Sequence, residues 1–567
     1  MRLFRYVILL LQSVSLLVFA EFRFSANPEQ IVNYLLSHAT ERPREIRKAF
    51  LDELFYYLDY AYPNGSLPLR NGSFVDDKLG WNLPVVEATV TAIVMQEPVV
   101  GLLVDLLKLN TFYETKEWNM NVSVGDASSH VIGPLLSMFD LFTGMYRQPP
   151  KADTYLHIFV TQAESLAESF LVAFDTPFGI PDPVVNLYPT TRRSGAENTT
   201  LHDMGSLFLE WVRLSDISGA QKFARLVETM GKRLQSPRPR ESQPFQGLLA
   251  NRVNLSDSHL IGNEGGWNAE SHGFYDSYIK MWVYDPIRFP YYKDWWIKSA
   301  DSVIENLKDQ TITKTHGTLL FLQDFAGNLT KANSSQLACA AGSSFIQGGM
   351  ALQREKYVQF GLQIAETCWS VYTHPGLWLE ARETKAPATI SPVELVDVIY
   401  DAFRATDDIK WQDRSWELFQ HLKTVHRHGF KKGSRLGKYN GKIDFSERME
   451  FTPDNPIFEE SNWLGRMLRT LWLMWAAPYS LVQIRRARED YNANRFVYTT
   501  NRVPLQVFGW SGKDSETLFW KQRTAFEHER EEAARRGSYL DFKYMEEYEH
   551  AWKPESWEEF FQSSHNK

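Results

Sequence analysis

The stretch that decides the fold covers residues 173–219 and reads "AFDTPFGIPDPVVNLYPTTRRSGAENTTLHDMGSLFLEWVRLSDISG". Its second half, 203–218, places Leu207, Trp211 and Leu214 at helical spacing, which predicts an amphipathic helix. The first half is rich in proline and glycine, so it predicts the end of one helix and a long loop. The local unit is therefore helix, loop and helix.

Helical segments of this kind recur along the chain. Residues 392–406, "PVELVDVIYDAFRAT", open on a proline and repeat apolar side chains at helical spacing. Residues 461–478, "SNWLGRMLRTLWLMWAAP", are apolar nearly all round, which predicts a buried helix that stops at the proline. Strand alternation is scarce, and no repeat of 20–50 residues is present. The sequence predicts a large all-α assembly of helical hairpins.

Length and charge narrow the class of protein. A chain of 567 residues is long enough for three or four domains or for one large closed barrel. Apolar residues make up 44% of it and charged residues 23%, a balance typical of a globular chain with a large core. The net charge is −8 at pH 7, so no basic surface for nucleic acid is expected.

The first twenty residues, "MRLFRYVILLLQSVSLLVFA", have the form of a secretory signal peptide: basic residues, an apolar stretch and a small residue at the end. An uncleaved anchor is the alternative, but the apolar run is short for a membrane span. We expect no other membrane span, and a lumenal or secreted chain. Seven N-x-S/T sequons agree with that location: Asn64, Asn71, Asn121, Asn198, Asn254, Asn328 and Asn333.

The two cysteines, Cys339 and Cys368, are also informative. In an oxidising lumen an isolated pair favours a disulfide over a metal site or a redox couple. The last segment, 511–567, is densely charged with scattered aromatic residues, which predicts a solvated helical extension.

From about residue 49 to 508 the chain resembles glycoside hydrolase family 47, the class I α-1,2-mannosidases, and is most similar to secreted and Golgi-type fungal members. Residues 173–219 carry the densest match, to the family's "AFDTPxGIP" turn and "GSLxLEWxRLS" helix. "FYDSYIKMWVYDP" (274–286) is similar to "FYEYLIKMYxYDP", and 337–380 resembles the stretch that holds the family's disulfide. The resemblance implies an (α/α)7 barrel over residues 21–510, with the active site at one mouth and a Cys339–Cys368 bridge.

The family removes terminal α-1,2-linked mannose from high-mannose N-glycans with inversion, using Ca²⁺ at the base of the pocket. Inversion needs one carboxylic acid for the leaving oxygen and one carboxylate to activate water. The helix that holds the family's acid, "VFExxIRxLGGLLS", matches "VGDASSHVIGPLLS" (124–137), so Asp126 takes the acid position with one methylene fewer and His130 replaces an arginine. In "SHGFYDSYIK", His272 replaces a second acidic group, and Asp276 keeps the next acid.

The family's base lies in "LRPExxES", which matches "SPVELVDV" (391–398) and implies Glu394 as base and Asp397 as the next acid. In "EESNWLGRMLRT" (459–470), Glu460 is kept, whereas Arg466 replaces an acid. The resemblance implies five acidic side chains that bind the sugar: Glu87, Glu210, Asp276, Asp397 and Glu460.

Residues 494–507, "NRFVYTTNRVPLQV", resemble the family's "FVFNTEAHPxxV". In the family this segment brings a threonine into the barrel floor, where its carbonyl and hydroxyl oxygens bind Ca²⁺. Thr500 is the implied metal ligand here, while Asn501 and Val503 replace a glutamate and a histidine. An amide lacks the charge that helps hold a divalent cation, so weaker Ca²⁺ binding is expected.

Substitutions gather at the active-site motifs, while the scaffold motifs persist. Three functions are therefore compatible with the sequence. The first is an α-mannosidase of reduced or altered activity, with Asp126 as acid, Glu394 as base and His272 as an auxiliary group. The second is a catalytically inactive protein that binds high-mannose glycans in quality control, and the third is a scaffold without sugar binding. A monomer in the endoplasmic reticulum, the Golgi lumen or the medium is expected.

Overall fold

The fold was analysed in a computed structural model, which describes these residues: 41–63, 78–143, 152–313, 316–331, 338–374, 376–378, 390–428, 462–476 and 494–508. The predicted signal peptide, the charged extension and Glu460 lie outside these ranges, as do the predicted barrel limits at 21 and 510.

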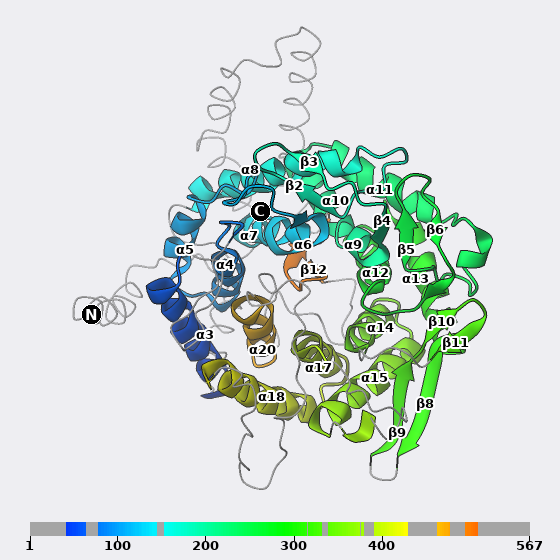
Figure 1. The fold of residues 1–567 in the computed structure, drawn as a ribbon. Helices are drawn as coiled ribbons and strands as arrows, with labels where there is room; N and C mark the ends of the chain where they lie inside the picture. The colour runs from blue at the N-terminus through cyan, green and yellow to red at the C-terminus, as the bar shows by residue number, and fades with distance from the viewer. Residues whose placement is uncertain are drawn as a thin grey trace.

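An inner ring of helices surrounds the centre of the molecule (Figure 1). Each member contacts the next, and the last contacts the first. In chain order the members are α4 (Leu83–Met95), α6–η1–α7 (Val124–Ala127, Ser128–Ile132 and Gly133–Thr143), α9–α10 (Leu201–Gly205 and Phe208–Ser218), α12 (His272–Tyr284), α14 (Cys339–Ala351), α17 (Pro392–Thr406) and η5–α20 (Trp463–Met467 and Leu468–Leu473).

An outer ring covers the inner one (Figure 1). Six of its members follow an inner helix directly, and α3, the first described helix, packs on α20 at the other end of the described chain. They are α3 (Glu41–Tyr60), α5 (Val100–Leu107), α8 (Ala152–Phe170), α11 (Lys222–Leu234), α13 (Pro290–Ser302), α15 (Glu355–Thr373) and α18 (Ile409–His428). Two concentric rings of seven members over the described residues confirm the predicted (α/α)7 barrel.

The burial of each ring follows from its sequence. Every residue of α4 is buried, as expected for a helix that is apolar all round. In α11, by contrast, one face is buried, through Phe223, Val227 and Met230, and the last turn carries Lys232 and Arg233. The predicted helix 392–406 is confirmed as α17, which begins after the N-cap Ser391.

The predicted single helix over 203–218 is wrong in one respect, because the chain breaks there into α9 and α10. Thr200 caps α9 through a capping box with Asp203. Near the break, a Cβ on Gly205 would lie 2.2 Å from the backbone nitrogen of Phe274. The backbones of α9 and α12 therefore approach each other more closely than a side chain would allow.

The loops between the helices contain short strands. The longest hairpin among the described residues pairs β8 (Lys308–Thr313) with β9 (Gly317–Leu322). Three three-stranded sheets accompany it: β1 (Val122–Ser123), β2 (Val184–Asn186) and β3 (Arg192–Arg193); β4 (Asn198–Thr200), β5 (Arg252–Asn254) and β6 (Leu260–Ile261); and β7 (Glu264–Gly265), β10 (Asp324–Ala326) and β11 (Leu329–Lys331). The 3₁₀ turns η2 (Leu171–Phe174) and η3 (Arg240–Ser242) and the π turn η4 (Val303–Leu307) complete the described elements.

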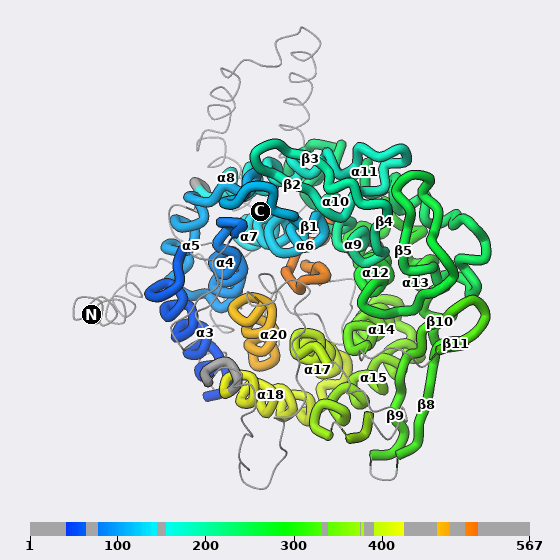
Figure 2. The backbone as a smooth tube through the Cα atoms, in the orientation of Figure 1, coloured from blue at the N-terminus to red at the C-terminus, as the bar shows by residue number. Residues whose placement is uncertain are grey.

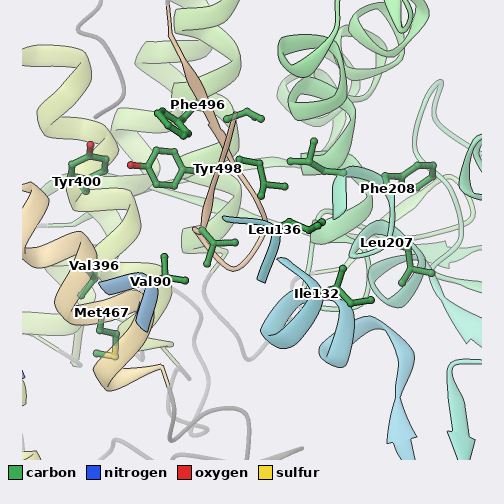
Figure 3. Close-up of a cluster of buried hydrophobic side chains, with 14 of the residues drawn as sticks. Val90, Ile132, Leu136, Leu207, Phe208, Val396, Tyr400, Met467, Phe496 and Tyr498 are labelled. Atoms are coloured by element: carbon green, nitrogen blue, oxygen red, sulfur yellow. The ribbon is translucent and has the colours of Figure 1, made fainter. Parts of the chain in front are cut away.

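A last hairpin, β12 (Phe496–Tyr498) and β13 (Pro504–Gln506), lies inside the inner ring. Figure 2 shows it as the orange segment at the centre. Phe496 and Tyr498 are buried among apolar side chains of the inner helices (Figure 3). The predicted excursion of 494–507 into the barrel is thus confirmed.

The predicted disulfide is confirmed as well. Cys339, the first residue of α14, is bonded to Cys368 of α15, 29 residues later, with the Cα atoms 6.0 Å apart. Over the described ranges, no helix combines the length and the apolar character that a membrane crossing needs.

Candidate active site

Three of the sequence-predicted residues lie in the first turn of an inner helix. Asp126 is in α6, His272 begins α12, and Glu394 is in α17. Because six inner helices each lead into an outer helix that returns, the inner helices all start at the same end of the barrel. The three residues therefore lie at the same end of the barrel.

The helical turns that hold Asp126 and Glu394 are fixed by serine caps. The backbone N–H of Asp126 donates to Ser123 Oγ (3.1 Å), and that of Glu394 donates to Ser391 Oγ (3.4 Å). Glu394 Oε2 also accepts from the backbone N–H of Ala340 (3.2 Å), in the first turn of α14. A carboxylate is stabilised at a helix N-terminus, so α14 helps to position Glu394.

His272 is enclosed at the mouth and carries no charge at neutral pH. Burial lowers its pKa to about 3. The indole N–H of Trp267 donates to His272 Nδ1 (3.2 Å), which leaves the ring proton on Nε2. His272 is therefore a neutral side chain that can donate a hydrogen bond from Nε2.

Below the mouth, Glu87 of α4 is fully buried and joined to two residues. His130 Nδ1 lies 2.9 Å from Glu87 Oε1, and Asn501 Nδ2 donates to the same oxygen (2.7 Å). His130 sits in the π-helical turn η1, a distortion that often re-aims side chains at functional sites. His130 and Asn501, which both differ from the family motifs, therefore share Glu87 as a hydrogen-bond partner.

Glu210 of α10 is also buried, but no donor among the described residues reaches its Oε1. Burial raises its pKa to about 8, so the carboxyl is protonated at neutral pH.

The remaining pocket carboxylates are paired with cations. Asp276 forms an ion pair with Lys280, one turn along α12. Burial would raise the pKa of Asp276, but the ammonium of Lys280 holds it below its usual range. Asp397 accepts from Arg466 Nε (2.7 Å), and Arg466 lies in the π-helical turn η5.

The turn between β12 and β13, residues 499–503, lies at the base of the site and is called the floor together with the buried side chains that contact it. The N–H of Arg502 donates to the carbonyl of Thr499 (2.9 Å), and Arg502 has a φ of 57°. This is the geometry of a turn closed by a left-handed residue, with Thr500 and Asn501 at its tip. Thr500 is partly buried.

Comparison with known proteins assigns this barrel to a family. The family model described as glycosyl hydrolase family 47 matches residues 49–507, most of the chain. The chain belongs to glycosyl hydrolase family 47.

Fungal family 47 proteins are the similar relatives. A probable mannosyl-oligosaccharide α-1,2-mannosidase 1B of Aspergillus flavus is 29% identical over 492 residues, which cover 82% of this chain and 92% of the relative. A mannosyl-oligosaccharide α-1,2-mannosidase of Coccidioides posadasii is 30% identical over 415 residues, covering 68% of this chain and 78% of the relative. The solved α-1,2-mannosidase from Trichoderma reesei superposes with a TM-score of 0.71 at 29% identity, covering 82% of this chain and 99% of that one.

The calcium ion expected for family 47 can be tested against the residues of the floor. Three buried oxygens there receive no hydrogen bond from any described residue: Glu87 Oε2, Glu210 Oε1 and Asn501 Oδ1. By atom type they would suit Ca²⁺. However, Glu210 is protonated at neutral pH and Asn501 is an amide. Glu87 Oε2 is closed in by the backbone of η5, since a Cβ on Gly465 would lie 2.4 Å from it.

The other carboxylates of the floor are already neutralised by the Lys280, Arg466 and Arg502 pairs. Among the described residues, no three His, Cys, Asp or Glu side chains gather into a set that could hold a metal ion. The described residues therefore do not fit a divalent cation.

Sequence reasoning missed four residues of the floor: Lys280, Asp401, Arg469 and Arg502. Asp401 follows Asp397 by four residues on one helix face, and Arg502 is the one charged residue within 496–507, so both carried a readable signal. Lys280 follows its ion-pair partner Asp276 by four residues, so that contact too was readable, whereas its bond to Thr499 was not. Arg469 donates to the carbonyls of the distant hairpin, which no local pattern predicts.

Proposed function

We propose that this family 47 protein hydrolyses terminal α-1,2-linked mannose on high-mannose N-glycans, with inversion and with a reduced rate. The proposal is carried by one observation: Asp126 and Glu394 occupy capped first turns of inner helices at the same mouth of the barrel. The relatives are named as mannosyl-oligosaccharide α-1,2-mannosidases, and this supports the proposal by analogy.

In this mechanism Asp126 donates a proton to the glycosidic oxygen as the bond to the anomeric carbon breaks. Glu394 removes a proton from a water molecule that attacks the same carbon from the opposite face. His272 donates from Nε2 to a sugar hydroxyl. The rate is reduced because Asp126 is one methylene shorter than the acid of the family motif, and a displacement of about 1 Å can cost about 10²-fold.

The protein is proposed to act as a monomer in the lumen of the secretory pathway or outside the cell. The signal-like sequence of residues 1–20, the sequons and the Cys339–Cys368 bridge support that location. Calcium is proposed to contribute less than in the family as a whole, because the floor carboxylates have protein partners.

The deciding experiment is mannose release from a Man9 glycan and from α-1,2-mannobiose. We expect slow release that Glu394→Gln abolishes. Asp105→Asn, on the exposed outer helix α5, is the matched control and should leave the rate unchanged. Release that survives Glu394→Gln would exclude Glu394 as the base.

A second variant tests the reason for the slow rate. Asp126→Glu restores the longer acid, and we expect the rate to rise by about 10²-fold. Asp126→Asn should abolish release. A rate that does not respond to Asp126→Glu would place the limitation elsewhere in the pocket.

The alternative is a glycan-binding protein without hydrolysis. The ion pair between Asp397 and Arg466 favours this alternative, because it occupies a carboxylate that was predicted to bind the sugar. Tight binding of Man9 by the wild-type chain without any release would support this alternative over the enzyme.

A further inference from the structure

A series of linked ion pairs connects η5 to the hairpin turn between β12 and β13. Arg466 donates to Asp397 Oδ2, and Arg502 Nε lies 3.4 Å from the same oxygen. Arg502 also binds Asp401 in bidentate fashion, with Nη1 3.0 Å from Oδ1. Gln347 of α14 donates to Asp401 Oδ2 (2.9 Å). Two arginines thus link η5, α17, α14 and the hairpin.

Cations also bind the backbone oxygens on both sides of Thr500. Lys280 Nζ donates to the carbonyl of Thr499 (3.1 Å). Arg469 Nη2 donates to the carbonyls of Asn501 (3.4 Å) and Arg502 (3.2 Å). These bonds hold the backbone on either side of Thr500, the residue implied as the metal ligand.

The charges of this floor are internally balanced. Among the described residues, the four cations Lys280, Arg466, Arg469 and Arg502 match the four carboxylates Glu87, Asp276, Asp397 and Asp401 in number, and all but Arg466 are nearly inaccessible to solvent. A divalent cation would bring two positive charges into a buried site whose charges already cancel, so no unpaired carboxylate would offset the cost of its desolvation.

We propose that protein cations replace the metal: Arg466 and Arg502, beside the Lys280 that the family motif also has, anchor the hairpin turn, and the fold does not depend on Ca²⁺. The two arginines occupy positions where the family motifs quoted above have an acid and an alanine. The substitutions at 466 and 502 therefore add positive charge to the site. They also engage Asp397 in ion pairs, so its carboxylate is not free to bind a metal ion. This inference concerns the stability of the barrel and holds whether or not the protein releases mannose.

The test uses the full-length protein and two readouts that need no activity. The melting temperature is compared in 5 mM CaCl₂ and in 5 mM EDTA, with about a 10²-fold excess of either reagent over protein. Metal content is measured by mass spectrometry after dialysis without chelator. We expect equal melting temperatures and no retained calcium. A melting temperature several degrees lower in EDTA, or one calcium retained per chain, would overturn the proposal.

The variant Arg466→Glu/Arg502→Ala removes the two cations and restores an acid. We expect it to melt several degrees below wild type in EDTA and to recover part of that loss in CaCl₂. Arg47→Ala is the matched control, because it removes a partly buried cation from Glu97, far from the hairpin in the sequence. It should melt at the same temperature in both solutions.

Hydrogen exchange supplies a local readout for the same variants. The amides of Thr499, Arg502 and Val503 are bonded within the hairpin and should exchange faster in the double variant but not in Arg47→Ala. Unchanged stability and unchanged exchange in the double variant would mean that the arginines do not anchor the turn.

Discussion

At the scale of single residues, burial sets which pocket groups carry charge. Glu210 and His272 are both neutral near pH 7, because the apolar surroundings disfavour their ionised forms. Asp276 stays ionised only because Lys280 lies beside it. The pocket therefore holds fewer free negative charges than its count of acidic residues suggests.

Glu210 makes a testable contribution to the pH dependence of stability. Its pKa is about 8 in the folded chain and near 4.5 when exposed. Below pH 4.5 the carboxyl is protonated in both states. As the pH rises towards 8 only the unfolded chain loses the proton, so the free energy of unfolding falls, by an amount on the order of a few kcal/mol.

Glu210→Gln cannot ionise and should remove this dependence. We expect its melting temperature to match wild type at pH 5 and to exceed it by several degrees at pH 9, measured by circular dichroism. Glu264→Gln, an exposed carboxylate, should show no such divergence. A constant difference between Glu210→Gln and wild type across this range would contradict the raised pKa.

At the scale of elements, α14 joins the disulfide to the proposed base. Cys339 is the first residue of α14, and the N–H of the next residue, Ala340, donates to Glu394 Oε2. The bridge to α15 therefore holds the helix end that positions Glu394. A bridge that closes a loop of this size stabilises by roughly 3 kcal/mol on the chain-entropy model.

Cys339→Ser/Cys368→Ser should consequently reduce both stability and turnover. We expect a fall in kcat that exceeds any change in KM, since Glu394 acts on water rather than on substrate binding. Arg47→Ala is again the control, because it destabilises the barrel without touching α14. Equal turnover per folded molecule in the cysteine variant would leave the bridge a purely stabilising role.

Elements also show how far the sequence could predict this structure. Helices such as 392–406 were predictable, because apolar spacing and a proline at the start are local signals. The break between α9 and α10 was not, since it accompanies the close approach of the α12 backbone at Gly205. The site residues were located by motif, but Asp397 could not be predicted as an ion-pair partner. Its partners lie 69 and about 105 residues further along the chain.

At the scale of the whole molecule, the ring is closed by segments from the two ends of the described chain. The outer helix α3, residues 41–60, packs on α20 and α18. It buries Ile46, Phe50, Leu54 and Tyr57 completely. Arg42 binds Asp413, and Lys423 binds Glu45, both at 3.0 Å. Over the described residues, the barrel is thus complete only when α3 covers α20.

Truncation tests this closure. A chain that begins at residue 64 lacks α3, and full burial of each lost side chain is worth about 1.5–3 kcal/mol, so the four together approach the total stability of a typical domain. We expect no cooperative melting transition and aggregation on size exclusion, because the apolar face of α20 becomes exposed. A chain that begins at residue 41, produced in the same way, is the control and should melt like the full-length protein. A soluble, cooperatively melting chain without α3 would mean that the remaining ring is stable while open.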